Sequence, residues 1–311
     1  MSDCAYQTVE RDGATYDQLT DESSGSRLLV ARLGAEPISF ARRKADGSWR
    51  GILYRDGETK PPEMGWGNHA TVMGYYIHRL LKGKTEYRGH TIKDGNHGFM
   101  RRKVMHSPEV GPRSMSYSVA PGDFTPAEYP YDVTLKLTYA LGADGTWKTT
   151  FLFQNREREL SAHVGFGLHP GFAIGSLDAC KIVLPAGHYR RHVAPGDFLS
   201  GEIQEIDHAG GEAPFPKATL PGSYLVELPA SGEKSATLED PAGGRRVTVR
   251  LAECPYLTLW SDGLGAFVCL EPCWGLPDHH EQRPFEKKLG IQEIPAGGKL
   301  ERSFVIEAAV T

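Results

Sequence analysis

The chain has 311 residues, with 39 acidic and 35 basic side chains and a formal net charge of −4. This charge excludes non-specific electrostatic binding to nucleic acid or to an anionic membrane surface. No apolar run approaches the ~18 residues that span a bilayer. The sequence combines 36 Gly and 21 Pro with 40% hydrophobic residues. That combination indicates a folded, loop-rich protein rather than a disordered one.

Apolar residues recur at every second position in several segments, which is typical of strands with one buried face. Asp46-Gly47, Asp144-Gly145 and Gly243-Gly244 lie between such segments and supply the positive φ that a hairpin turn needs. In chain order, the predicted strands are residues 38–40, 52–54, 133–139, 147–153, 237–239, 247–251, 264–270 and 300–310.

Long helices are not predicted, because no stretch of three or more turns combines helical spacing with caps. Parallel α/β folds need helices as crossovers and are therefore disfavoured. The sequence thus predicts an all-β fold, a large antiparallel β-sandwich. No composition shift marks a linker, so residues 1–311 are predicted to form a single domain. The shared Val-Ala-Pro-Gly-Asp-Phe of residues 119–124 and 193–198 is interpreted as a reused turn.

The N-terminal residues lack the basic start and apolar core of a secretion signal. Five Cys is an odd number, and no Asn begins an Asn-x-Ser/Thr glycosylation site. These features predict a cytoplasmic protein without a disulfide framework.

Three segments place a titratable group beside Gly or Pro at the end of an apolar strand, where a rigid sheet can aim it into a cleft. His97 is flanked by glycines, and Pro170 restricts the backbone of His169. Glu271 follows an almost wholly apolar strand, where a carboxylate is either paired structurally or tuned for general-base work. A plain loop His and a buried structural His remain the alternatives for His97 and His169.

A zinc site is not predicted, although Cys254, Cys269, Cys273, His279 and His280 are all suitable ligands. Their spacings match no paired Cys-x-x-Cys or His-x-x-x-His arrangement. Motifs for a serine or cysteine nucleophile, for dinucleotides and for ATP are also missing from the sequence.

Aromatic residues neighbour these polar segments, and aromatic faces beside fixed polar groups suit sugar rings. Core packing is the alternative explanation, and the stronger one for Phe99 and Phe172. The aromatic residues concerned are Trp66, Tyr75, Tyr76, Phe99, Phe172 and Trp274.

Three motifs in order resemble the aldose 1-epimerase family, the galactose mutarotase-like proteins. They are His-Gly-Phe-x-Arg at 97–101, His-Pro-x-Phe at 169–172 and Cys-x-Glu-Pro-x-Trp at 269–274. Residues 288–298 are similar to the usual ending of the family, and the resemblance extends from about Trp66 to Val310. It implies a large antiparallel β-sandwich and an isomerase that interconverts the α and β anomers of a sugar without a cofactor or metal.

The resemblance also implies roles for individual residues. Glu271 corresponds to the general base that takes the anomeric hydroxyl proton, and His169 to the general acid that protonates the ring oxygen. His97 corresponds to a second histidine that hydrogen-bonds the sugar near its ring oxygen, and Arg79 to an arginine that clamps its hydroxyls. Trp274, beside Glu271, and Asp197, in a Pro-Gly-Asp turn, are expected as further sugar contacts.

The sequence leaves the substrate and the activity open. A free aldohexose such as glucose or galactose is the leading expectation for the substrate. The sequence departs from the family pattern at His78, just before Arg79, where many relatives have Gly or Asn. Arg283, Lys287 and Lys288 form either a phosphate site for a hexose 6-phosphate or a solvated charged loop. A sugar-binding or sensing protein without catalysis is a further alternative. A glycoside-processing enzyme needs two opposed carboxylates, and only Glu271 stands in a motif. The expected partner is a small sugar, and both a monomer and a homodimer remain open.

Overall fold

The computed structural model describes residues 4–93, 95–214 and 222–311. Strands dominate these residues, and each helical element is a single 3₁₀ turn of three residues: η1 (Leu81–Gly83), η2 (Met100–Arg102) and η4 (Phe285–Lys287). The all-β prediction is therefore confirmed. None of the helices in the described ranges is long and apolar enough to cross a bilayer.

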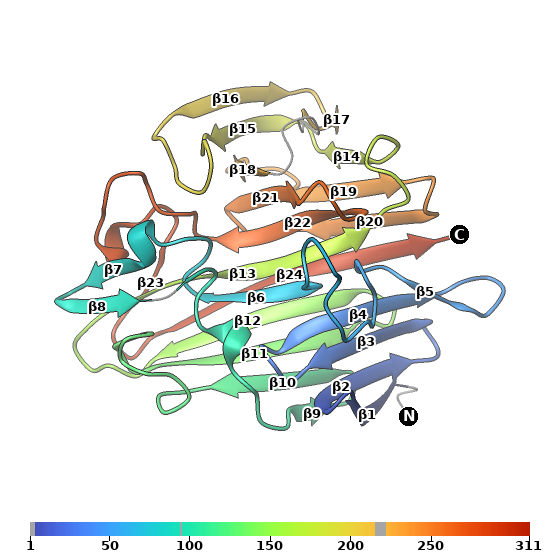
Figure 1. Cartoon of the computed structure of the whole chain (residues 1–311), viewed down its shortest axis with the longest axis horizontal. Helices are drawn as coiled ribbons and strands as arrows, with labels where there is room; N and C mark the ends of the chain where they lie inside the picture. The colour runs from blue at the N-terminus through green and yellow to red at the C-terminus, as the bar shows by residue number, and fades with distance from the viewer. Residues whose placement is uncertain (1–3, 94, 215–221) are drawn as a thin grey trace.

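Two large sheets are stacked in the molecule, and every pairing between their strands is antiparallel (Figure 1). The first has the order β17 (Gly211–Glu212), β14 (Lys181–Leu184), β19 (Ser235–Asp240), β20 (Arg245–Arg250), β24 (Lys299–Val310), β12 (Trp147–Asn155), β11 (Val133–Leu141), β10 (Ser114–Val119) and β9 (Glu109–Gly111). The second has the order β16 (Ile203–His208), β15 (Gly187–His192), β18 (Gly222–Glu227), β21 (Tyr256–Ser261), β22 (Phe267–Trp274), β13 (Ala162–Ala173) and β23 (Gln292–Ile294), and β6 (Ala70–Tyr75) also pairs with β13.

Two smaller sheets complete the fold. The N-terminal one contains β1 (Cys4–Arg11), β2 (Ala14–Asp21), β3 (Ser26–Ala31), β4 (Glu36–Arg43) and β5 (Trp49–Gly51), and the other contains β7 (Lys84–Tyr87) and β8 (His90–Lys93). Strands β1–β3 were not predicted, and the strand predicted at 52–54 is not formed, since β5 ends at Gly51. The strand predicted at 264–270 begins at Phe267 and continues to Trp274.

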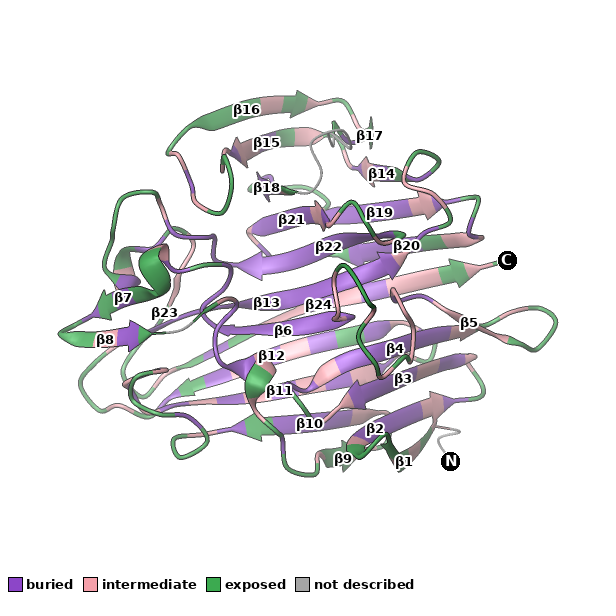
Figure 2. Cartoon of the chain, viewed as in Figure 1, coloured by how far each residue is buried: buried purple, intermediate pink, exposed green. Residues whose placement is uncertain are grey.

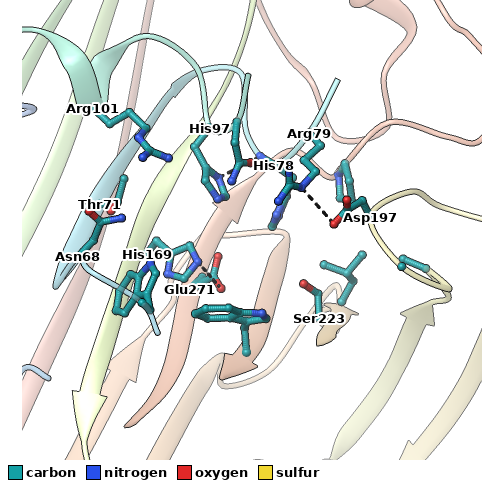
Figure 3. Close-up of a pocket in the computed structure, with 17 residues that line it drawn as sticks. Asn68, Thr71, His78, Arg79, His97, Arg101, His169, Asp197, Ser223 and Glu271 are labelled. Carbon is teal, nitrogen blue, oxygen red and sulfur yellow. Dashed lines mark hydrogen bonds and ion pairs between the residues drawn. The ribbon is translucent and has the colours of Figure 1, made fainter. Parts of the chain in front are cut away.

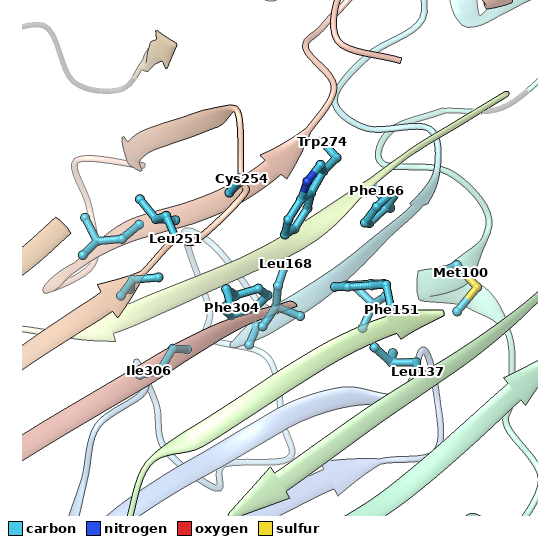
Figure 4. Packing of buried hydrophobic residues seen from close by; sticks show 14 of the residues in the cluster. Met100, Leu137, Phe151, Phe166, Leu168, Leu251, Cys254, Trp274, Phe304 and Ile306 are labelled. Atoms are coloured by element: carbon cyan, nitrogen blue, oxygen red, sulfur yellow. The ribbon is translucent and has the colours of Figure 1, made fainter. Parts of the chain in front are cut away.

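The core lies between the two large sheets, as predicted for a sandwich. Strand β11 alternates strictly between buried and half-buried residues, and it pairs with β12 from Val133↔Asn155 to Leu141↔Trp147. On β12, Phe151 and Phe153 pack against Phe166 of β13, with ring centroids 5.1 and 4.7 Å apart. Figure 4 shows Phe151 and Phe166 facing each other between the sheets. One apolar cluster includes residues from both large sheets and from the N-terminal sheet; the single-domain prediction stays a prediction.

Strands β13 and β22 are covered on both faces, so nearly all of their residues are buried (Figure 2). Successive side chains of a strand point to opposite faces. Phe166 and Leu168 of β13 and Trp274 of β22 point into the core between the sheets (Figure 4). The opposite face carries His169 and Glu271, and it forms the floor of the site.

Candidate functional site

A cavity of about 310 Å³ opens on the face of β13 and β22 that is turned away from the core. This volume lies at the small end of the range for small-molecule sites. Its polar lining residues are Asn68, Thr71, His78, Arg79, Asn96, His97, Arg101, His169, Asp197, Ser223 and Glu271 (Figure 3). The structure thus brings together five of the six predicted site residues: His169, Glu271, His97, Arg79 and Asp197.

His169 and Glu271 lie opposite each other on neighbouring antiparallel strands, because the pairs Gly167↔Cys273 and Gly171↔Cys269 enclose them. Nε2 of His169 is 3.3 Å from Oε1 of Glu271, and both side chains are buried. Nδ1 of His169 and Oε2 of Glu271 have no hydrogen-bond partner within the described residues. Two buried atoms that exchange protons readily are therefore left without a hydrogen bond from the described part of the chain.

Burial sets the protonation of this pair. Loss of hydration raises the pKa of Glu271 well above its usual value of 4.5 and lowers the pKa of His169 from 6.5 to about 3. A buried carboxylate without a positive partner is costly, as is a buried imidazolium without a negative one. The two shifts together favour a neutral pair, in which Glu271 and His169 share one titratable proton. Because the two groups interact, each titration step is a property of the pair and not of one residue.

His97 is fixed by backbone contacts from two sides. The backbone N–H of His78 donates to Nδ1 of His97 at 3.1 Å, and the carbonyl of His97 accepts from Gly74 N at 3.1 Å. Burial, with smaller contributions from nearby charges, lowers the pKa of His97 well below 6.5, so its ring is neutral. Since Nδ1 accepts a hydrogen bond, the ring proton of the neutral form resides on Nε2, which makes this nitrogen a donor.

Gly98 explains how His97 reaches the pocket. Its φ is +72°, and a Cβ on it would lie 2.1 Å from the carbonyl oxygen of Gly74. Only glycine therefore allows the chain after His97 to pass this close to β6. The ring of His97 consequently lies 5.3 Å from the ring of His169, centroid to centroid.

Arg79 and Asp197 form an ion pair at the rim of the pocket, with Nε and Oδ1 3.1 Å apart (Figure 3). Both side chains are more than half exposed, at 51% and 58%. An exposed pair of this kind contributes little to stability, so both groups are available to a ligand. Arg79 also forms a β-bridge with Asn96, which joins the loop before η1 to the loop before His97.

Two tryptophans flank His169. The ring of Trp66 stacks at 5.0 Å from the imidazole, and the ring of Trp260 lies edge-on at 5.4 Å. Trp66 is held by a hydrogen bond from its backbone N–H to Asp262 Oδ2 at 2.7 Å, and it covers Gly171, where a Cβ would lie 2.4 Å from its ring. Trp66 was noted in the sequence, whereas Trp260 was missed because no motif surrounds it.

The sixth predicted residue, Trp274, is not at the pocket, so its predicted place in the site is wrong. Its side chain is fully buried and stacks on Phe166 with ring centroids 5.0 Å apart (Figure 4). The reason is the strand period, because Trp274 lies three residues after Glu271 and points to the opposite face. Phe99 and Phe172 are core residues as well.

The basic cluster that suggested a phosphate site also lies outside this pocket. Lys288 is buried in an ion pair with Asp278, and Arg283 and Lys288 line a separate cavity of about 10 Å³. The pocket itself contains an arginine that sequence reasoning did not assign. Arg101 ends the His-Gly-Phe-x-Arg motif and forms no ion pair or hydrogen bond with another described residue.

Of the five residues considered as zinc ligands in the sequence, only Cys269 and Cys273 belong to a cluster of possible metal ligands in the described ranges, and each joins a different cluster. Among the described residues, two groups bring metal-ligating atoms within 4.8 Å of one another: His78, Glu271 and Cys273, and His169, Cys269 and Glu271. His279 and His280 belong to neither group.

The sequence pattern of the family described as Aldose 1-epimerase matches residues 24–299 of this chain. The chain belongs to the aldose 1-epimerase family. The resemblance noted in the three motifs is thereby confirmed. The family is an isomerase family, and membership supports a mutarotase role at the level of the family.

A curated relative, the chromosomal protein LacX of Lactococcus lactis subsp. lactis, is 25% identical over 198 residues. The match covers 60% of this chain and 65% of LacX, so it spans less than two thirds of that protein.

Solved structures of aldose 1-epimerase relatives share the fold. A galactose mutarotase related enzyme from Lactobacillus acidophilus has a TM-score of 0.82 at 20% identity, covering 99% of this chain and 98% of its own. A galactose mutarotase-like protein from Lactobacillus casei has a TM-score of 0.79 at 22% identity, covering 98% of this chain and all of its own (100%). These likenesses confirm the galactose mutarotase-like fold.

Proposed function

We propose that this aldose 1-epimerase family member is a mutarotase that interconverts the α and β anomers of a free aldohexose. The observation that carries the proposal is the contact of 3.3 Å between His169 Nε2 and Glu271 Oε1 on the floor of a pocket that His97 and Arg79 also line. Anomer exchange needs one proton removed from the anomeric oxygen and one delivered to the ring oxygen. A neighbouring acid and base can perform both transfers on one bound ring.

In the proposed reaction, Glu271 takes the proton of the anomeric hydroxyl while His169 donates a proton to the ring oxygen. The bond between C1 and the ring oxygen breaks, and the open-chain aldehyde forms. Rotation about the C1–C2 bond then exposes the other face of the carbonyl. On closure, His169 takes the proton back from the attacking hydroxyl, and Glu271 returns its proton to the new anomeric oxygen.

This cycle starts with the proton on His169, whereas burial alone favours the proton on Glu271. A bound sugar reverses the preference, because its anomeric hydroxyl donates to the carboxylate and its ring oxygen accepts from the imidazolium. Both contacts stabilise the charged arrangement of the pair without changing its proton count. His97, with its proton on Nε2, supplies a further donor toward the ring oxygen.

The pH dependence follows from the proton count. Adding a second proton to the pair removes the base, and this happens only as the pH falls toward the depressed pKa of His169, about 3. Losing the single proton removes the acid, and the raised pKa of Glu271 moves this step above the usual carboxyl range. We therefore expect kcat/KM not to fall as the pH is lowered from 7 to 5, after subtraction of the uncatalysed rate. An acid limb with a midpoint near 6.5 would contradict the assignment.

A second candidate function is mutarotation of a hexose 6-phosphate, and Arg101 is the observation that favours it. An arginine in a ligand pocket without an ion-pair partner in the described part of the chain is suited to bind an anionic group. The phosphate would then bind to Arg101 rather than to the cluster around Lys288.

Replacing Arg101 by Gln separates the two substrates. If a 6-phosphate is the substrate, we expect kcat/KM for glucose 6-phosphate to fall by roughly tenfold or more, since a hydrogen bond to a charged group is worth ~1.5–3 kcal/mol, while the value for glucose changes little. The matched control is Arg102→Gln, because Arg102 pairs with Glu128 outside the pocket. Equal losses on both sugars would show that Arg101 contacts ring hydroxyls and not a phosphate.

Anomer-resolved NMR exchange spectroscopy with glucose, galactose and their 6-phosphates tests the proposal. Faster exchange than in buffer supports a mutarotase and ranks the four sugars. A folded protein that binds one of these sugars and leaves exchange at the background rate would instead be a sugar-binding protein.

A further inference from the structure

One face of β22 presents three potential metal ligands in a row. Cys269, Glu271 and Cys273 alternate along the strand and therefore point to the same side. Their exposures are 0%, 1% and 0%. The proposed reaction uses only Glu271 of these three, which leaves two buried thiols beside the reacting carboxylate without a role.

His78 brings an imidazole to the Cys273 end of this row. Its Nε2 is 3.5 Å from Thr258 Oγ1 and 4.0 Å from Cys273 Sγ, so both contacts are at the long limit for hydrogen bonds. The metal-ligating atoms of His78, Glu271 and Cys273 all lie within 4.8 Å of one another. Tetrahedral zinc, with bonds of about 2.0–2.3 Å, needs ligand atoms about 3.3–3.8 Å apart, so binding requires these atoms to approach one another by up to about 1.5 Å.

Two further observations point to a ligand here. Glu271 Oε2 is buried and has no hydrogen-bond partner within the described residues, while Oε1 contacts His169. His78 lines the sugar pocket, so an ion can reach the group from solvent. An imidazole, a carboxylate and a thiolate are all established zinc ligands, and three protein ligands leave a fourth position for water.

We propose that His78, Glu271 and Cys273 bind a zinc ion on the pocket floor and that this ion switches off the pocket. Binding releases the thiol proton of Cys273, and the carboxyl proton where Glu271 carries one, to solvent. The bound ion engages the Glu271 carboxylate and occupies the space in front of it. Zinc and sugar therefore exclude each other, and this consequence rests on the proposed function, whereas the metal site itself does not.

Titration of the purified chain with Co²⁺, a spectroscopic substitute for zinc, tests the site directly. We expect strong visible bands of tetrahedral cobalt and a near-ultraviolet thiolate-to-cobalt band, both abolished by one equivalent of Zn²⁺. Cys273→Ala should remove the thiolate band and weaken zinc binding by roughly tenfold or more. Loss of a residue that only hydrogen-bonds to a metal ligand already costs about that much, and loss of a ligand should cost at least as much. Cys269→Ala is the matched control, since it removes a buried thiol from the same face on the other side of Glu271, and it should keep the band.

A second variant covers the case in which Cys273→Ala does not fold. His78 has a φ of +55°, a conformation that Asn tolerates, so His78→Asn removes the imidazole without adding backbone strain. It should also weaken zinc binding by roughly tenfold or more. Loss of the thiolate band in Cys269→Ala together with its retention in Cys273→Ala would overturn the proposal, as would a wild-type protein that binds no cobalt.

Anomer exchange provides the functional arm of the test. Cys273→Ala should keep the wild-type rate without metal and require roughly tenfold or more zinc for half-inhibition. Cobalt binding by a protein that accelerates no anomer exchange would leave the metal site supported and contradict only the proposed function. Zinc inhibition that is equal in Cys273→Ala and wild type would overturn the assignment of Cys273 as a ligand.

Discussion

Replacement of Glu271 by Gln is expected to lower kcat for anomer exchange by ~10²–10⁴-fold, the usual worth of a general acid or base. The amide keeps the size of the side chain but cannot accept the anomeric proton. Because Glu271 is buried at the centre of β22, circular dichroism and thermal unfolding of the variant must accompany the rate.

Cys269→Ala serves as the control, since Cys269 is equally buried on the same face of β22 and the proposed reaction gives it no role. We expect this variant to retain the wild-type rate. Full activity of a folded Glu271→Gln variant would remove the carboxylate from the mechanism.

Replacement of His169 by Ala is expected to cause a loss of the same order, ~10²–10⁴-fold in kcat, because the neutral ring of His97 can donate a hydrogen bond to the ring oxygen but is too weak an acid to protonate it as the ring opens. The suitable control is His163→Gln, which changes a buried histidine of the same strand that contacts Tyr87 Oη at 3.0 Å and does not line the pocket. The measurement is the rate of anomer exchange at saturating sugar, with circular dichroism of each variant.

The two residues should also act as a unit. A Glu271→Gln/His169→Ala double variant is then hardly slower than the slower single variant, because one missing partner already stops the coupled transfer. Fully multiplicative losses, or an active His169→Ala variant, would show that His169 does not work with Glu271.

The alternation of apolar residues and the turn motifs predicted hairpins whose two strands are neighbours in the sequence. The alternation at 133–139 and 147–153 and the Asp144-Gly145 turn between them predicted the hairpin of β11 and β12. Strands β1–β3 were missed, and β5 ends before residues 52–54. Leu53 forms only an isolated bridge with Phe172, far along the chain, which no local pattern encodes.

The site was predicted in part for a similar reason. The three motifs named His97, His169 and Glu271, and the register of β13 and β22 brings the last two together. Trp274 was misplaced because motif proximity was given more weight than strand alternation, although the sequence already assigns residues 271 and 274 to opposite faces. The same alternation could have placed Cys269 and Cys273 beside Glu271. Trp260 enters the pocket through tertiary packing, and nothing in its local sequence indicates this. Arg101 ends the His-Gly-Phe-x-Arg motif that carries His97, so this motif could have assigned it to the pocket.

Polarimetry of freshly dissolved α-D-glucose and α-D-galactose, with and without the protein, tests the central claim most directly. The account predicts that optical rotation reaches the same end point faster with wild-type protein, in proportion to its concentration, and at the buffer rate with Glu271→Gln. Decay at the buffer rate for both sugars and for their 6-phosphates, from folded wild-type protein, would contradict it.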